Sequence, residues 1–198
     1  MEFGSIAGIA MFSQKTYSVE LYFDETSSER IRRLWAQVRS LASGTPSRFH
    51  SRPHVSLAVL EAGNVSELST LVSTVAMREA SFELQFSAVG VFPTNAGVVF
   101  LAPVVTEPLL KLHRRFHQQL ENVGATSIEY YKPDRWVPHC TIAQHLKPHE
   151  IVNAIDIVRS SDLFDKVTVC EVGLVEASPV RLVCSLPLNR QMCDRREP

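Results

Sequence analysis

The hydrophobic and polar positions along the first half of the chain follow two kinds of pattern. Residues 15–23, 53–60, 82–92 and 97–105 are β-rich runs, the first of which alternates apolar and polar positions, and they predict strands. Residues 27–41 and 65–78 instead repeat apolar positions at helical spacing. The expected order is strand, helix, strand, helix and then two strands joined by a turn.

The second half of the chain repeats most of this order. We expect a helix over 107–123, a strand over 136–143, a helix over 148–160 and strands over 167–175 and 181–186. Pro-His-Val-Ser-Leu-Ala at 53–58 matches Pro-His-Cys-Thr-Ile-Ala at 138–143, and Val-Gly at 89–90 matches Val-Gly at 172–173. This repetition predicts an α+β fold with two pseudo-symmetric lobes, whose antiparallel-rich sheets flank a central cleft.

The two ends of the sequence differ from this repeated unit. Residues 1–10 are rich in small residues and precede a second Met at position 11, so we interpret them as a leader. Residues 191–198 are rich in charge and are expected to form a flexible tail. Residues 11–190 are expected to form a single two-lobed domain.

Composition and charge narrow the classes of function. A chain of 198 residues with 45% hydrophobic content can bury a core without disulfides or metal. A formal net charge of -1 excludes a global positive field that recruits long nucleic acid. No stretch is long and apolar enough for a membrane helix, no signal peptide is apparent, and the four cysteines form no CxxC pair. We expect a soluble intracellular protein, with a monomer favoured.

Two tripeptides of the form His-x-Ser/Thr carry the candidate chemistry. They begin at His54 and His139, and their hydroxyl residues are Ser56 and Thr141. Residues i and i+2 of a strand share a face, so each imidazole lies beside its hydroxyl, with small Ala58 expected on the first of these faces. One neutral ring can deprotonate a nucleophile while the other, protonated, supplies the leaving oxygen with a proton. The hydroxyls can donate hydrogen bonds to phosphate oxygens, which predicts a metal-free phosphate clamp.

With both motifs in a matching repeat, the sequence resembles the two-histidine (2H) phosphoesterase superfamily, the 2′-5′ RNA ligase-like and cyclic nucleotide phosphodiesterase group. The resemblance covers roughly residues 17–188. It implies a bilobal fold, no metal or cofactor, and a nucleotide or RNA-end substrate with a 2′,3′-cyclic phosphate or a 2′-5′ linkage. In this family one histidine is the general base and the other the general acid, and the resemblance leaves open which is which. Ligase activity is not inferred.

Three other interpretations of the two histidines remain open at this point. A catalytically inactive nucleotide- or RNA-binding protein of the same fold would keep both histidines as phosphate ligands. Structural histidines satisfied by the backbone would leave the duplicated hydroxyl unexplained. A metal-dependent hydrolase would lose its activity in chelator. Turnover by His54→Ala and His139→Ala variants separates the binding protein from the enzyme.

Other residues near the motifs are candidates for substrate contact. We expect such contacts from Tyr22, Tyr131, Trp136 and Arg135. For Tyr131 and Trp136, stacking on a base and packing on the core are equal alternatives. Arg52 and Arg135 precede the two motifs and could contact further phosphates of a longer substrate, with surface solvation as the default expectation for both.

Three further residues are interpreted as having no part in the chemistry. His113 and His117 lie at i, i+4 on a helix and could hold a metal with a third ligand, but we expect a solvated helix face. Cys140 follows His139, yet strand alternation turns its thiol to the opposite face. We therefore expect no cysteine nucleophile.

Overall fold

The computed structural model describes residues 15–40, 52–177 and 179–189. The expected leader and tail lie outside these residues. Within them the order of elements follows the sequence pattern: β1 (Tyr17–Phe23), α1 (Glu25–Arg39), β2 (His54–Leu60), α2 (Val65–Arg78), β3 (Phe82–Val91), β4 (Val99–Pro103), α3 (Glu107–Asn122), the 3₁₀ turn η1 (Glu129–Tyr131), β5 (Cys140–Ala143), α4 (Pro148–Arg159), β6 (Lys166–Ala177) and β7 (Val180–Pro187). The strand of the second motif is shorter than predicted, so His139 directly precedes β5.

Short polar side chains begin three of the helices where the pattern places them. The Asp24 side chain accepts a hydrogen bond from the backbone of Ser27, and Asn64 and Thr106 cap α2 and α3 in the same way. These bonds satisfy backbone N–H groups that the first helical turn leaves without partners. The apolar positions at helical spacing are the buried ones, as in α1 with Ile31, Leu34, Trp35 and Val38. Among the described helices, none is long and apolar enough to cross a membrane.

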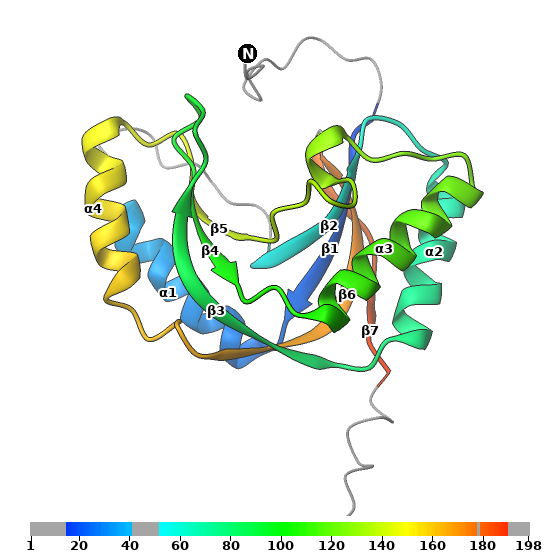
Figure 1. Ribbon diagram of the computed structural model, residues 1–198, viewed down its shortest axis with the longest axis horizontal. Helices are drawn as coiled ribbons and strands as arrows, with labels where there is room; N and C mark the ends of the chain where they lie inside the picture. The colour runs from blue at the N-terminus through cyan, green and yellow to red at the C-terminus, as the bar shows by residue number, and fades with distance from the viewer. Residues whose placement is uncertain (1–14, 41–51, 178, 190–198) are drawn as a thin grey trace, which may run out of the picture.

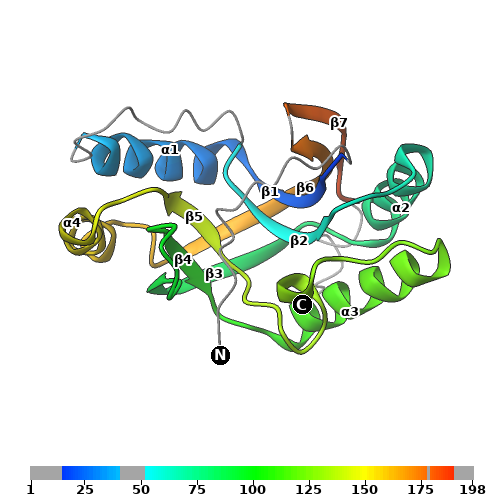
Figure 2. The ribbon, with the colours of Figure 1, turned by 90° about the horizontal axis from the view of Figure 1, so that it is seen from above.

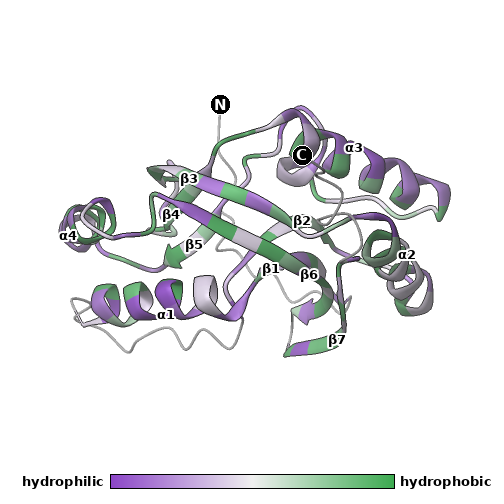
Figure 3. Ribbon diagram, turned by 90° about the horizontal axis from the view of Figure 1, so that it is seen from below, coloured by the Kyte–Doolittle hydropathy of each residue, from purple (hydrophilic) through white to green (hydrophobic). Residues whose placement is uncertain are grey.

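The described strands form antiparallel pairs in the order β2-β1-β6-β3-β4-β5, with β7 as a further partner of β6. One edge of β6 pairs with β1, while its other edge pairs first with β3 and then with β7. One lobe therefore holds β2, β1, β7 and most of β6, and the other holds β3, β4 and β5. The long strands β3 and β6 run side by side between the lobes (Figure 3).

Two helices cover the outer side of each lobe (Figure 1). α1 and α4 contact each other and the lobe of β3, β4 and β5, while α2 and α3 contact each other and the lobe of β2, β6 and β7. Each half of the sequence contributes one helix to each lobe, because α1 packs on β5 and α3 packs on β2. Seen from above, β2 and β5 are neighbours in the middle of the molecule (Figure 2). The predicted bilobal α+β fold is confirmed.

A β-bulge in β2 changes the faces that a regular strand predicts. Glu20 of β1 pairs with Ser56. The preceding residue, Val19, pairs with Ala58, so Leu57 has no partner in the ladder. Directly opposed residues share one face of a sheet. Ala58 therefore lies on the buried face with Val19, and the prediction that it lines the motif face was wrong.

Candidate active site

The two motif histidines are held in the same way by their own backbone. The Nδ1 atom of His54 lies 2.7 Å from the carbonyl oxygen of Arg52, and the Nδ1 atom of His139 lies 2.7 Å from that of Val137. A carbonyl oxygen only accepts hydrogen bonds, so each Nδ1 carries a proton and donates it. In both rings Nε2 is therefore the atom available to accept a proton or, when charged, to donate one.

Two tryptophans support the motif strands in equivalent ways. Trp35 of α1 donates its indole N–H to the carbonyl oxygen of Thr141 at 3.0 Å. Trp136 donates its own to the carbonyl oxygen of Ser56 at 3.1 Å. These bonds tie each motif strand to an element of the opposite half of the sequence. Each hydroxyl residue is thereby fixed through its backbone.

Packing is the favoured alternative for Trp136. Its ring stacks on the imidazole of His113, with the ring centroids 4.0 Å apart and the planes at 2°. His113 is 1% exposed and His117 5% exposed, so the expectation of a solvated helix face for both was wrong. Their Nε2 atoms pair with the backbone carbonyl oxygens of Tyr131 and Leu57. Both histidines therefore join α3 to the motif region as structural groups.

Burial keeps these two histidines neutral. It is the largest cause that lowers the pKa of His113 to about 4, and the neighbouring His117 adds to the effect. Burial also lowers the pKa of His117. Among the described residues, no group of three or more His, Cys, Asp or Glu side chains is arranged to hold a metal ion.

The repeated Val-Gly pairs give each motif histidine an aromatic neighbour. A Cβ atom at Gly173 would lie 2.6 Å from the ring of Tyr22, and one at Gly90 would meet the ring of Phe100. The Tyr22 ring lies edge-on to His54 at 6.4 Å between centroids. The Phe100 ring lies 5.3 Å from that of His139. Glycine at these two positions makes room for the rings.

Tyr22 is 2% exposed, which does not favour its predicted contact with substrate. Arg52 lies over its ring at 4.0 Å and forms a two-pronged ion pair with Glu171. Burial, followed by the charge of Glu20, raises the pKa of Tyr22, which keeps its hydroxyl neutral. The expectation that Arg52 is merely solvated was wrong, because Tyr22 and Glu171 fix its guanidinium.

The two motif strands, β2 and β5, contact each other. The charge of His54 contributes to the lowered pKa of His139, although burial is the largest cause. Tyr131 lies next to the second motif, with its ring centroid 6.5 Å from that of His139. Burial, followed by the charge of Glu20, raises the pKa of Tyr131 to about 12.

The two motif hydroxyls differ in their exposure. Ser56 is 9% exposed, and its Oγ atom lies 3.3 Å from that of Ser18. Thr141 is half-buried and lines a hollow of about 400 Å³ beside His139. Cys140, between His139 and Thr141, is fully buried, and its burial raises the pKa of its thiol to about 12. A thiol in this state is a poor nucleophile.

The hollow beside His139 is mostly apolar and also bears the predicted contact residues Tyr131 and Arg135. Phe92 contributes an aromatic wall, since it stacks on Phe100 at 4.4 Å and lies edge-on to His139 at 4.9 Å. Phe92 and Phe100 were missed in the sequence because apolar residues on a strand predict core. Arg135 is exposed and pairs with Glu129 at 3.3 Å.

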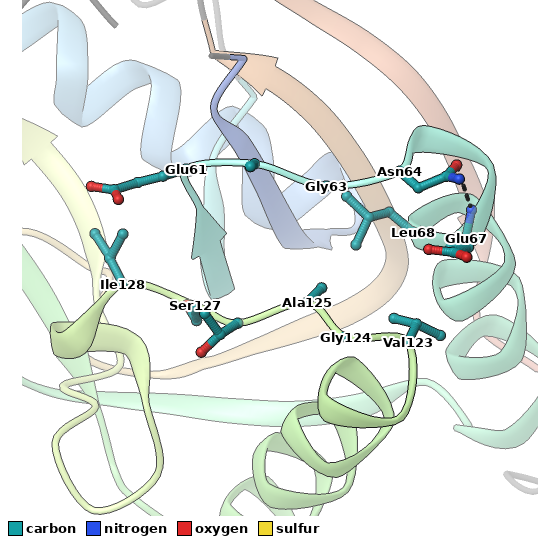
Figure 4. Close-up of a pocket in the computed structure, with 12 residues that line it drawn as sticks. Glu61, Gly63, Asn64, Glu67, Leu68, Val123, Gly124, Ala125, Ser127 and Ile128 are labelled. Atoms are coloured by element: carbon teal, nitrogen blue, oxygen red, sulfur yellow. Dashed lines mark hydrogen bonds between the residues drawn. The ribbon is translucent and has the colours of Figure 1, made fainter.

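A second hollow, of about 330 Å³, lies between the start of α2 and the segment that follows α3. Figure 4 shows its lining, with Glu61 and Glu67 on one side and the chain from Val123 to Ile128 on the other. The Asn64 side chain already caps α2 there. Neither motif contributes to this hollow.

The chain is similar to known proteins in sequence and in fold. The family model of the 2′-5′ RNA ligase superfamily matches residues 10–180. No curated protein matches the chain. Escherichia coli LigT complexed with 3′-AMP is 17% identical, with a TM-score of 0.62 over 89% of this chain and 99% of that one. The protein TT0787 of Thermus thermophilus is also 17% identical, with a TM-score of 0.64 over the same shares. At this identity the likeness concerns the fold.

Proposed function

Because the chain belongs to the 2′-5′ RNA ligase superfamily, we propose that it is a phosphodiesterase that cleaves a 2′,3′-cyclic or 2′-linked ribose phosphate by general acid-base catalysis. The observation that carries this proposal is the matched pair of imidazoles. His54 and His139 each donate Nδ1–H to a backbone carbonyl and keep Nε2 for proton transfer. The reaction requires no metal, because the two rings together supply both proton transfers.

The hydroxyls of Thr141 and Ser56 stabilise the phosphate in this proposal. A donor aimed at a nonbridging oxygen is most effective when negative charge grows there in the transition state. Thr141 lines the hollow beside His139 and meets the phosphate directly. Ser56 turns from Ser18 to reach it, since the two Oγ atoms lie 3.3 Å apart in the free protein.

The hollow beside His139 holds the base of the substrate in this proposal. Its walls include the rings of Phe92, Tyr130 and Tyr131, and base stacking on an aromatic ring contributes about 1–3 kcal/mol. Arg135 lies at the same hollow and is free to contact a further phosphate by releasing Glu129. Crystal structures of E. coli LigT with 3′-AMP, NADP+ and ATP support a nucleotide as the ligand.

Turnover of defined substrates tests the proposal. The panel holds 2′,3′-cyclic nucleotides and 2′-5′ and 3′-5′ dinucleotides, with products separated by chromatography and EDTA in the buffer. His54→Ala and His139→Ala are each expected to lower kcat about 10²- to 10⁴-fold, because each removes one proton-transfer group. His149→Ala, on the exposed side of α4, is the control and keeps the wild-type rate.

Two outcomes contradict the proposal and point elsewhere. Nucleotide binding without turnover by the wild type identifies a catalytically inactive nucleotide-binding protein. Turnover that EDTA abolishes and added divalent metal restores identifies a metal-dependent hydrolase. A loss of less than tenfold in either histidine variant removes that ring from the acid-base mechanism.

A further inference from the structure

The two halves of the site differ in one pair of equivalent positions. In the first lobe Glu20 pairs with Ser56 on one side and with Gly173 on the other. In the second lobe Phe100 pairs with Thr141 on one side and with Gly90 on the other. The middle strand of each lobe therefore places one residue between the motif hydroxyl and the repeated glycine. That residue is a carboxylate beside His54 and a phenyl ring beside His139.

The carboxylate of Glu20 is buried, and the ring of His54 lies close to it. The residue is 4% exposed, and its Oε2 atom has no hydrogen-bond partner among the described residues. Oε2 lies 3.5 Å from Nδ1 of His54. A buried carboxylate without a counter-charge is costly, and the nearby Arg52 is already paired with Glu171. The ring of His54 is the group beside Glu20 that can carry the opposite charge.

The surroundings of His139 favour the opposite charge state. Its ring neighbours are Phe92, Phe100 and Tyr131, and its Nδ1 atom bonds with the carbonyl oxygen of Val137. Burial lowers the pKa of this histidine, and the charge of His54 lowers it further. A charge on His54 therefore favours a neutral His139.

We infer that Glu20 is a positioning residue that holds His54 protonated, so that His54 is the general acid and His139 the general base. This inference rests on the proposed function. The nucleophile, a water molecule or a ribose hydroxyl, gives its proton to Nε2 of His139 and forms a bond to phosphorus. The bond from phosphorus to the leaving oxygen breaks, and that oxygen takes the proton from Nε2 of His54. Exchange with water then restores the neutral base and the charged acid.

The charged and titratable groups around His54 come from several elements. Glu20 and Tyr22 of β1 lie beside its ring, and a charge on His54 acts on His139 before β5. Arg52 before β2 lies over Tyr22 and pairs with Glu171 of β6, and Tyr131 of η1 lies next to His139. Both phenols stay neutral, because burial and the charge of Glu20 raise the pKa of Tyr22 and of Tyr131. Arg52 and Glu171 offset each other. Glu20 is therefore the group whose charge His54 balances.

The leaving group distinguishes an acid from a base. A nucleoside 2′-(p-nitrophenyl phosphate) departs as p-nitrophenolate without protonation, whereas the matched methyl ester needs the general acid. On the methyl ester, His54→Ala, His139→Ala and Glu20→Gln are each expected to lower kcat by about tenfold or more. On the p-nitrophenyl ester, the loss of kcat in His54→Ala is expected to be at least about tenfold smaller than on the methyl ester, and that in Glu20→Gln about threefold smaller. The loss of kcat in His139→Ala is expected to be the same on both esters.

Glu176→Gln is the matched control, because Glu176 is another buried carboxylate but is paired with Lys15 and Arg181. Any loss in this variant is the same on both esters. The kcat of the wild type on a 2′,3′-cyclic nucleotide is also followed against pH. Glu20→Gln is expected to move the alkaline fall of the rate to lower pH and to leave the acid limb in place.

The outcomes distinguish the inferred roles of Glu20, His54 and His139 from the proposed phosphodiesterase function. If the p-nitrophenyl ester restores the kcat of His139→Ala instead of that of His54→Ala, then His139 is the general acid and the inference is overturned. The proposed phosphodiesterase function still stands in that case. Equal losses for Glu20→Gln on both esters, with an unmoved alkaline limb, overturn the role of Glu20. A wild type that cleaves neither ester and no cyclic nucleotide overturns the proposed function and this inference together.

Discussion

Acid pH is expected to destabilise the protein through His113. This side chain is 1% exposed, stacks on Trp136 and pairs with the backbone carbonyl of Tyr131. Burial lowers its pKa from 6.5 to about 4. Between these two values the unfolded chain binds a proton at this position that the folded protein does not, so stability falls as the pH falls through this window. The loss reaches about 2.5 kcal/mol at pH 4.5 and about 3 kcal/mol below pH 4.

Urea unfolding, followed by far-ultraviolet circular dichroism from pH 7.5 to 4.5, measures this loss. His113→Phe keeps a ring against Trp136 but neither titrates nor bonds with Tyr131, so it should be less stable than wild type at pH 7.5 by about 1 kcal/mol. As the pH falls, the wild type loses this advantage: the two proteins are equally stable at about pH 6, and at pH 4.5 the variant is the more stable by about 1.5 kcal/mol. His149→Phe, at an exposed position of α4, keeps the wild-type dependence. Parallel stability curves for wild type and His113→Phe would refute the reasoning.

Three further substitutions test how the site is held. Gly173→Ala forces the Tyr22 ring to move, since the new Cβ would lie 2.6 Å from it, and we expect about 1–3 kcal/mol lower stability together with a lower kcat. Trp136→Phe removes the N–H that bonds with the Ser56 carbonyl, and thermal unfolding should show a loss of about 1–3 kcal/mol, because that buried carbonyl loses its partner. Phe92→Ala removes an aromatic wall of the hollow, and titration with a nucleotide should show weaker binding by about 1–3 kcal/mol.

Local sequence patterns were sufficient to predict the order of the helices and strands and to identify the two His-x-Ser/Thr motifs. Apolar positions at helical spacing placed α2 at its observed bounds, because the same side chains that repeat in sequence, such as Leu68 and Val72, are the buried ones. The repeat of the His-x-Ser/Thr and Val-Gly pairs predicted two similar lobes, although each lobe combines elements from both halves of the sequence. Polar residues at every second position of β1, including Glu20, indicate a strand with one polar face.

Tertiary structure alone decided which side chains each residue meets. The i, i+4 spacing of His113 and His117 is the same for an exposed and a buried helix face, and only the packing of α3 on β2 buries them. Likewise, alternation cannot reveal the bulge at Leu57 that turns Ala58 to the core, because the bulge exists only in the pairing with β1. Periodicity describes one element at a time, whereas burial, register and the charge facing a histidine arise between elements distant in sequence.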